Sequence, residues 1–222
     1  MALALNIEAK EAYSLGLKAK KKEAWSRAEQ YFTRAQKLEP SWSKPLEAII
    51  RLRLDGHLPK PPLNAELALF RALEPSSYKF WLFRGRYSHQ RGQHQEALES
   101  YAKVLEIRPR TLSAMLYRGD LLLHLNSPDR ALVDYEAVLK LRSDHAEARW
   151  GKLLALIQLE QWTKAHELAN ELAADEPNNP ALWNLRHLAS RYSGLPEPAP
   201  RPRNTPKYRP LLPSDDVRSS QQ

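Results

Sequence analysis

The sequence of 222 residues contains no cysteine. This absence excludes disulfide bonds, thiolate-ligated metal sites and a cysteine nucleophile. Disulfides are typical of oxidising compartments, so a chain without cysteine fits a reducing one. We therefore expect a cytoplasmic protein.

Long hydrophobic runs are also missing. No uninterrupted apolar segment approaches the roughly 18 residues that a membrane-spanning helix requires. The N-terminal stretch MALALNIEAKEAY has no basic leader, and its apolar run is too short for the core of a signal peptide. Both observations agree with the cytoplasmic expectation.

Motifs for catalysis and cofactor binding are absent as well. Only seven glycines are present, and neither phosphate-binding pattern, G-x-x-x-x-G-K-[ST] or G-x-G-x-x-G, occurs. The nucleophile pattern G-x-S-x-G is missing, and no two histidines have the spacing of H-E-x-x-H. The paired carboxylates Asp215 and Asp216 lie in a proline-rich tail that offers no rigid scaffold for a reaction. We therefore predict no enzymatic activity, no cofactor and no metal.

Positive charge is in excess, with a net charge of +8. Residues 1–60 carry 12 Lys and Arg against seven Asp and Glu, and Lys18–Lys22 reads KAKKK. The helix dipole favours lysines at a helix C-terminus, so a solvated helix end is one interpretation of this cluster. An anionic membrane surface, a nucleic acid or an acidic protein partner is the alternative.

The chain also contains an internal repeat. Pro75 and Pro109 lie 34 residues apart, and Pro40, Ser143 and Pro177 continue nearly the same spacing. The segments before these positions share an alanine, an aromatic or small residue four positions later, and an apolar or small residue three positions after that. The alanines are Ala28, Ala97, Ala131 and Ala165, followed by Phe32, Tyr101, Tyr135 and Ala169, and then by Ala35, Val104, Val138 and Leu172. This period predicts a recurring helix–turn–helix unit.

Another apolar-periodic segment precedes each of these helices. Gly16, Gly85 and Gly119 take equivalent places in three of the preceding segments. A residue without a side chain lets two helices approach closely. Leu153 stands at the equivalent place in the last copy, so we expect different packing there.

These residues resemble the tetratricopeptide repeat family over positions 9–177. The resemblance implies an all-α, right-handed α-solenoid in a domain of 1–194, and the change of composition at Leu195 predicts a flexible tail over 195–222. The implied elements are five repeats, 9–42, 43–77, 78–111, 112–145 and 146–179, and a capping helix over 180–192. The second copy is degenerate because its linker DGHLPKPPLNAE carries three prolines, so its second helix should start near Leu63. A cap is expected because each repeat buries its apolar face only against its neighbours.

The tail has seven prolines in 28 residues and few apolar residues to bury. One interpretation is a solvated terminus. The other is a linear motif within Thr205–Pro213 that docks on a partner or on the chain's own groove. Its candidate residues are Lys207, Tyr208, Arg209, Leu211 and Leu212.

In this family the first helices of successive repeats line a concave groove, and the resemblance nominates groove residues by position. They are Tyr13, Leu17, Lys20, Lys21, Arg51, Lys79, Leu82, Arg86, His89, Gln90, Leu116, Asp120, His124, Trp150, Leu154, Gln158 and Asn184. Cations dominate the first half of this set and apolar residues the second, so we expect a partner segment with an acidic end and an apolar end. Arg86 and Trp150 are the leading anchors, because arginine and aromatic residues often dominate binding energies. The alternatives are a salt-bridged surface arginine and a tryptophan used in helix packing.

Three functions are compatible with this sequence. The favoured one is a non-enzymatic scaffold or adaptor that holds a protein segment in the groove, for example in the assembly of a larger complex. The second is a chaperone for one exported or membrane-bound client, and the third is an accessory protein that binds nucleic acid or an anionic membrane through Lys18–Lys22 and the tail. Self-association is also open, and no small-molecule substrate is expected. Tyr13 and Leu17 stand where chaperone-tail-binding members carry lysine and asparagine, so that partner is not expected.

Overall fold

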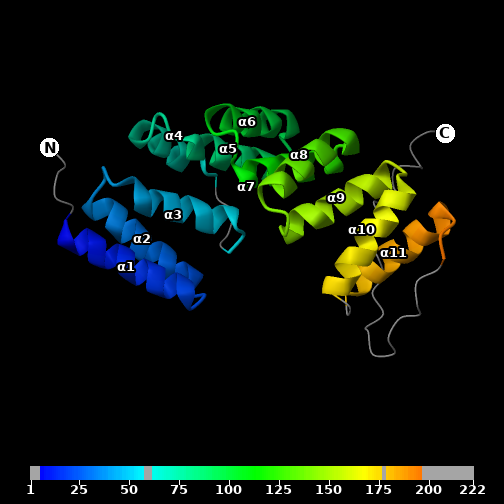
Figure 1. Cartoon of the computed structure of the whole chain (residues 1–222). Coiled ribbons are helices and arrows are strands. Elements are labelled where there is room, and N and C mark those ends of the chain that lie inside the picture. Colours follow the sequence, from blue (N-terminus) through cyan, green and yellow to red (C-terminus); the bar gives the residue numbers. More distant parts are fainter. Residues whose placement is uncertain (1–5, 58–61, 177–178, 197–222) are drawn as a thin grey trace, which may run out of the picture. The chain divides into compact units, whose positions relative to one another are not determined.

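The computed structural model describes residues 6–57, 62–176 and 179–196, which form eleven α-helices and no β-strand (Figure 1). The helices in chain order are α1 (Ile7–Lys21), α2 (Trp25–Leu38), α3 (Ser43–Leu54), α4 (Asn64–Leu73), α5 (Tyr78–Gln90), α6 (His94–Ile107), α7 (Leu112–His124), α8 (Pro128–Leu141), α9 (Ala146–Gln158), α10 (Trp162–Asp175) and α11 (Pro180–Ser193). The chain divides into two compact units, Met1–Arg118 (unit 1) and Gly119–Gln222 (unit 2). The all-helical prediction is confirmed.

Helices that follow one another in sequence pack against one another in space. In unit 1, α1 packs against α2, α2 against α3, and α5 against α6. In unit 2, α8 packs against α9, and α10 packs against both α9 and α11. These helices therefore pack mainly against their neighbours in the chain, which is the packing of a helical-repeat solenoid.

Glycines set the distance between paired helices in unit 1. A Cβ atom on Gly16 would lie 2.5 Å from the ring of Phe32, and one on Gly85 would lie 2.6 Å from the ring of Tyr101. Contacts this short do not occur between real side chains, so only glycine fits. The close helix approach expected from the sequence is confirmed.

In the last repeat, the large residue of such a pair lies on the first helix and the small residue on the second. Tyr135 of the fourth repeat is fully buried, and a Cβ atom on Gly119 or Gly151 would lie 3.0 or 2.3 Å from its ring. One repeat later, Leu153 and Ala169 take the places of Gly119 and Tyr135, and both are fully buried in one cluster. The larger side chain has moved from the second helix to the first, which confirms the expected difference in packing.

The turn inside several repeats places one residue in the left-handed region of backbone space. Gly92, Asn126 and Glu160 recur every 34 residues with φ of 72°, 54° and 56°, and Glu23 has φ of 57°. Only Gly92 adopts this conformation without steric cost. The other three turns are held in it by the helices on either side.

The second helix of the second repeat and the last helix of the solenoid both begin close to where the sequence predicts. The helix α4 begins at Asn64, next to the expected Leu63. At the other end, the side chain of Asn179 accepts hydrogen bonds from the backbone N–H of Ala181 and Leu182, which starts α11. Leu182 is buried in one cluster with Leu172 of α10, so α11 covers the apolar face of the last repeat.

Candidate functional site

A first cavity, of about 320 Å³, lies in unit 1 and is here named the cationic cavity. Side chains from α1, α2, α3 and α5 line it: Tyr13, Leu17, Lys20, Phe32, Lys44, Glu47, Ala48, Arg51 and Lys79. Five predicted groove residues are therefore brought together, namely Tyr13, Leu17, Lys20, Arg51 and Lys79. Lys44 and Glu47, in the first turns of α3, also line the cavity and were not among the predicted groove residues.

One carboxylate organises the cations of this cavity. Glu47 forms ion pairs with Arg51 at 2.9 Å and with Lys79 at 2.7 Å. Lys20 and Lys44 have no ion-pair partner among the described residues. The lining thus holds four cations and one carboxylate, and this balance favours an anionic ligand.

Aromatic rings border the cations. The ring of Tyr13 lies 5.4 Å from that of Phe32 and 4.9 Å from that of Trp42. Burial raises the pKa of Tyr13, and the nearby charge of Glu47 raises it further. The phenol therefore stays neutral at physiological pH and can donate a hydrogen bond to a ligand.

Arg86, one of the two expected anchors, is engaged inside unit 1. Its Nη2 atom lies 2.8 Å from Oδ1 of Asp55 and donates to the carbonyl oxygen of Leu54 at 3.3 Å. Its guanidinium carbon lies 5.0 Å from the ring centroid of Tyr117, and Nε2 of Gln90 donates to the same Leu54 carbonyl at 2.7 Å. Arg86 and Gln90 thus satisfy the C-terminal end of α3, which corresponds to the salt-bridged alternative.

The other predicted residues of unit 1 differ in accessibility. Leu82 and Leu116 are 8% and 7% exposed and offer little surface to a partner. Lys21 is exposed in the last turn of α1. His89 is half-buried, with its ring centroid 6.3 Å from that of His94.

A second cavity, of about 620 Å³, lies in unit 2 and is here named the acidic cavity. Its lining comprises Asp120, Leu123, Tyr135, Asp144, Ala146, Glu147, Arg149, Trp150, Gly151, Leu154, Leu172, Asp175, Glu176, Asn179, Ala181 and Leu182. The predicted groove residues Asp120, Trp150 and Leu154 meet here. His124 is exposed in the last turn of α7, and Gln158 and Asn184 are half-buried on α9 and α11 outside the lining.

Three of the acidic groups in this cavity have partners within unit 2, and one of them is Glu176, whose Oε2 atom accepts a hydrogen bond from Nδ2 of Asn179 at 2.7 Å. The hydroxyl of Tyr135 donates to Oδ1 of Asp120 at 2.7 Å. Burial raises the pKa of Tyr135 far above its ordinary value, and the charge of Asp120 raises it further. Arg149 forms an ion pair with Asp175.

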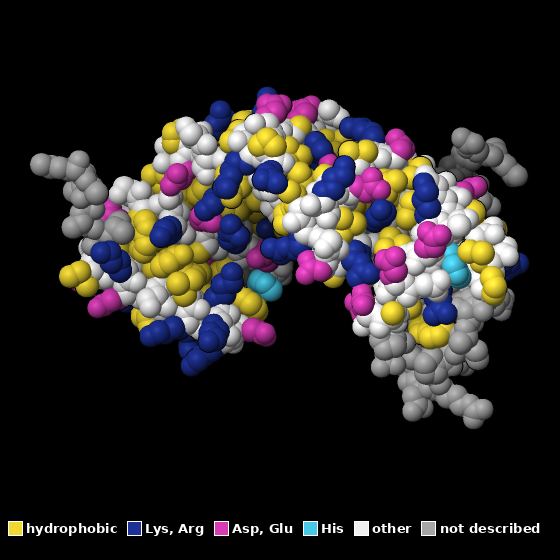
Figure 2. All heavy atoms as spheres, viewed as in Figure 1, with side chains coloured by type: hydrophobic (Ala, Val, Ile, Leu, Met, Phe, Trp, Pro, Cys, Tyr) yellow, Lys and Arg dark blue, Asp and Glu magenta, His cyan; other side chains and the backbone are white. Residues whose placement is uncertain are grey.

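Three carboxylates of the cavity, Asp144, Glu147 and Glu176, were not among the predicted groove residues. Asp144 precedes α9, Glu147 lies in its first turn, and Glu176 follows α10. Figure 2 shows acidic side chains gathered over α10 of unit 2, and Lys and Arg side chains at the end of α1 in unit 1. Asp144 and Glu176 lie in turns, which nomination by helix register passes over, whereas Glu147 takes the repeat position of Lys79 and the register itself could have found it.

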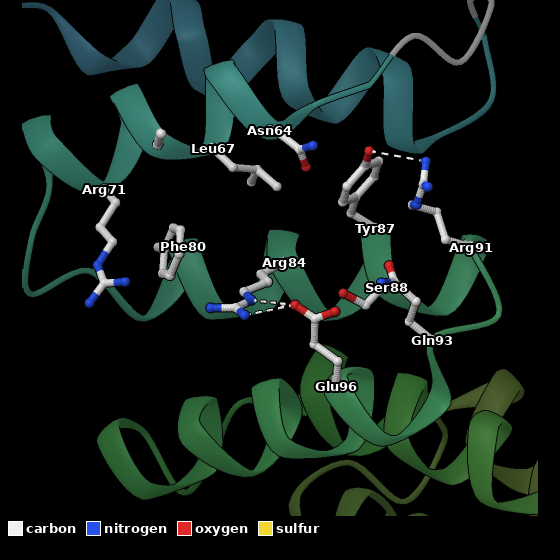
Figure 3. A pocket seen from close by; sticks show the side chains of 11 residues that line it. Asn64, Leu67, Arg71, Phe80, Arg84, Tyr87, Ser88, Arg91, Gln93 and Glu96 are labelled. Carbon is white, nitrogen blue, oxygen red and sulfur yellow. Dashed lines mark hydrogen bonds and ion pairs between the residues drawn. The ribbon is translucent and has the colours of Figure 1, made fainter.

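A third cavity, of about 390 Å³, is formed by α4, α5 and α6 and contains three arginines (Figure 3). Arg84 pairs with Glu96 at 2.7 Å, and Arg91 lies beside the hydroxyl of Tyr87 at 3.5 Å. Arg71 lies 5.1 Å from the ring centroid of Phe80. All three arginines thus have contacts within unit 1, so this cavity is less suited to an anion than the cationic cavity.

The remaining predictions concern the tail, a metal site and membrane-spanning helices. The tail residues Lys207, Tyr208, Arg209, Leu211 and Leu212 lie outside the described residues. Among residues 6–57, 62–176 and 179–196, no three His, Asp or Glu side chains are grouped to hold a metal ion. None of the described helices combines the length and apolar character needed to cross a membrane.

Comparison with known proteins identifies the repeat. Two models described as "Tetratricopeptide repeat" match residues 63–111 and 122–188, together more than half of the chain. A tetratricopeptide repeat protein from Parabacteroides merdae is similar in structure, with a TM-score of 0.63 and 18% identity over 85% of this chain and 75% of that one. Pseudomonas aeruginosa pilF has a TM-score of 0.71 and 15% identity over 84% of this chain and 85% of its own.

A third solved structure is YrrB, described as a tetratricopeptide repeat protein with an unusual peptide-binding site. It has a TM-score of 0.58 and 17% identity over 73% of this chain and 84% of its own. At these identities the likeness concerns the fold. No curated protein sequence matches this chain.

Proposed function

The chain belongs to the tetratricopeptide repeat family, and we propose that it is a non-enzymatic adaptor that binds an acidic segment of a protein partner in the cationic cavity of unit 1. The observation that carries this proposal is the lining of that cavity. Four cations line the cavity beside aromatic rings. Glu47 holds two of these cations, Arg51 and Lys79, in place through ion pairs.

The chemistry of the lining defines the segment. Carboxylates of the partner would pair with Lys20 and Lys44, because charge-assisted hydrogen bonds are the strong ones at interfaces. An apolar side chain next to those carboxylates would pack on Tyr13 and Leu17, the latter 46% exposed. The segment is therefore acidic with at least one apolar residue. The peptide-binding site named for YrrB supports segment binding as a use of this fold.

A pull-down with mass spectrometry tests this proposal with the full chain and one charge reversal. Lys44 lies in the first turn of α3, where a carboxylate is favoured by the helix dipole, so Lys44→Glu should not weaken folding. Lys10 occupies the equivalent position of the first repeat, near the start of α1, but does not line the cavity. Lys10→Glu is therefore the matched control, since it makes the same change of net charge.

We expect a protein partner that is retained by wild type and by Lys10→Glu and is lost, by at least tenfold, with Lys44→Glu. Recovery of nucleic acid or lipid, equally weakened by both variants and by salt, would instead support the basic surface of Lys18–Lys22 and overturn the adaptor proposal.

The chaperone alternative predicts a different behaviour of the partner. A client that aggregates alone and becomes soluble on co-expression with this chain would be a chaperone substrate. A partner that is soluble by itself supports an adaptor. Measuring the soluble fraction of the captured partner with and without this chain separates the two.

A further inference from the structure

The acidic cavity of unit 2 differs in chemistry from the cationic cavity and needs a different occupant. Its volume of about 620 Å³ falls in the range of ligand-binding pockets. Trp150 and Leu154 are half-buried and form its apolar part together with Leu172 and Leu182. Such a lining accommodates apolar side chains inside a polar border.

Carboxylates supply that border. Asp144, Glu147 and Glu176 are exposed, and neither Asp144 nor Glu147 has an ion-pair partner among the described residues. Arg149 is the one cation in the lining, and it is paired with Asp175. The cavity therefore fits a segment that is both cationic and apolar, which is the opposite of the segment proposed for unit 1.

The chain itself contains a segment of that kind. Residues 201–213 read RPRNTPKYRPLLP, with four cations, no acidic residue, one tyrosine and two leucines. Proline-rich sequences favour an extended backbone before binding, so they lose less conformational entropy when they dock. Charge and apolar content thus both match the acidic cavity.

The tail is long enough to reach the acidic cavity from the end of α11. The hydroxyl of Ser190 donates to the carbonyl oxygens of Leu195 and Pro196, which holds the end of α11 where the tail begins. The cavity includes Ala181 and Leu182 at the opposite end of α11, a helix of 14 residues and hence about 21 Å long. The 11 residues that follow Pro196, up to Lys207, can span about 34 Å when extended.

We propose that residues 201–213 bind in the acidic cavity of the same chain, with the cations facing Asp144 and Glu147 and with Tyr208 and Leu211 packed against Trp150 and Leu154. This contact makes the tail a built-in competitor for any cationic partner segment at unit 2. The proposal uses a different cavity from the adaptor proposal and does not depend on it.

A peptide titration with the full chain tests the docking. The probe is a fluorescein-labelled peptide of residues 201–213, followed by anisotropy. A tail variant carries Arg201→Gln, Arg203→Gln, Lys207→Gln and Arg209→Gln. A tethered segment competes at an effective concentration near millimolar, so the peptide should bind the tail variant at least tenfold more tightly than wild type.

Two further substitutions in the tail variant localise the site. Glu147→Lys reverses a charge in the cavity and should weaken peptide binding about tenfold. Glu167→Lys makes the same change on an exposed position of α10 outside the cavity and should change it less than twofold. Equal binding to wild type and tail variant, absence of binding up to 1 mM, or equal effects of the two reversals would each overturn the proposal.

Cross-linking decides whether the tail belongs to the same chain. Carbodiimide joins an amine directly to a carboxylate, so wild type should yield a link between Lys207 and Asp144, Glu147 or Glu176. In an equal mixture of ¹⁴N- and ¹⁵N-labelled chains, we expect linked peptides of a single isotope. Links of mixed isotope would show that a second copy supplies the tail, which contradicts docking within one chain.

Discussion

Lys79 and Glu147 occupy the same position of the repeat, 68 residues apart, yet they carry opposite charges. Lys44 and Lys79 line the cationic cavity of unit 1, and Glu147 lines the acidic cavity of unit 2. The difference extends to the whole units, because residues 1–118 carry 21 Lys and Arg against 12 Asp and Glu, whereas residues 119–222 carry 13 against 14. Surface positions can differ in this way because they contribute little to folding, so one repeat frame presents cavities of opposite charge.

The buried positions also differ between the units, but close packing limits how they can differ. Unit 1 pairs Gly85 with Tyr101, whereas the last repeat of unit 2 pairs Leu153 with Ala169. Side-chain volume moves between the two helices, but each pair keeps one small residue. The comparison indicates that close packing constrains the pair and not the single residue.

The largest expected effect on the free energy of unfolding comes from placing the Leu and Ala pair of unit 2 at the positions of Gly85 and Tyr101 in unit 1. Tyr101→Ala removes a fully buried ring and should lower the free energy of unfolding by about 3–5 kcal/mol. Adding Gly85→Leu reproduces the Leu153 and Ala169 pair and should restore about 1–3 kcal/mol of that loss. Urea unfolding followed by circular dichroism measures both. If the double variant is less stable than Tyr101→Ala alone, the two pairs are not interchangeable.

A smaller effect is expected at the position that holds Arg86 in unit 1 and Asp120 in unit 2. Arg86→Met should lower the free energy of unfolding by about 2 kcal/mol, because the Leu54 carbonyl and Asp55 each lose a charge-assisted hydrogen bond. Arg91→Met is the control, since that arginine is exposed and its side-chain hydrogen-bond and cation–π contacts among the described residues are with Tyr87 alone, a 3.5 Å hydrogen bond to the hydroxyl and a guanidinium carbon 5.6 Å from the ring centroid. Equal unfolding midpoints for wild type and Arg86→Met would return Arg86 to the list of partner anchors.

Tyr135 gives a pH-dependent prediction, because Phe32 fills the equivalent place in unit 1 without a hydroxyl. Tyr135→Phe should lower the free energy of unfolding at pH 7 by about 1 kcal/mol through loss of the bond to Asp120. The pKa of Tyr135 is raised in the folded state, so its contribution is complete below the unfolded pKa of about 10 and falls as pH rises above it. At pH 11 wild type should have lost about 1.4 kcal/mol at this group, and the phenylalanine variant should be at least as stable.

Urea unfolding of both proteins at pH 7, 9 and 11 checks this reversal. A constant difference across the three values would mean that Tyr135 ionises in the folded protein as easily as in the unfolded chain.

The smallest effect concerns the turn, where unit 1 has Gly92 and unit 2 has Glu160 in the left-handed region. Glu160→Gly relieves this steric cost and should raise the free energy of unfolding by about 0.5–1 kcal/mol. Gly92→Glu should lower it by a similar amount. Thermal unfolding measures both, and opposite shifts in Tm are expected. Shifts of the same sign would show that side-chain contacts outweigh the backbone conformation at these turns.

Much of the fold could be predicted from the sequence because buried positions recur. The alanines at 28, 97, 131 and 165 are all fully buried, and the prolines of the second repeat delay α4 to Asn64. The groove residues were predicted less accurately, because the helix register gives the face on which a residue lies but not the groups that it contacts. Leu82 and Leu116 lie in the packed interior, and Arg86 reaches the end of α3.

The sequence by itself determined the repeat period, the helix pairs, the glycines at which paired helices approach closely and the excess of positive charge at the N-terminal end. These features follow from local spacing, since helical periodicity and turn residues act within about 34 positions. Only the tertiary structure decided which charges share a cavity. Glu47 meets Lys79 across 32 positions, and Asp144 and Glu176 from separate turns line one cavity, because packing of neighbouring repeats sets distances that linear spacing does not contain.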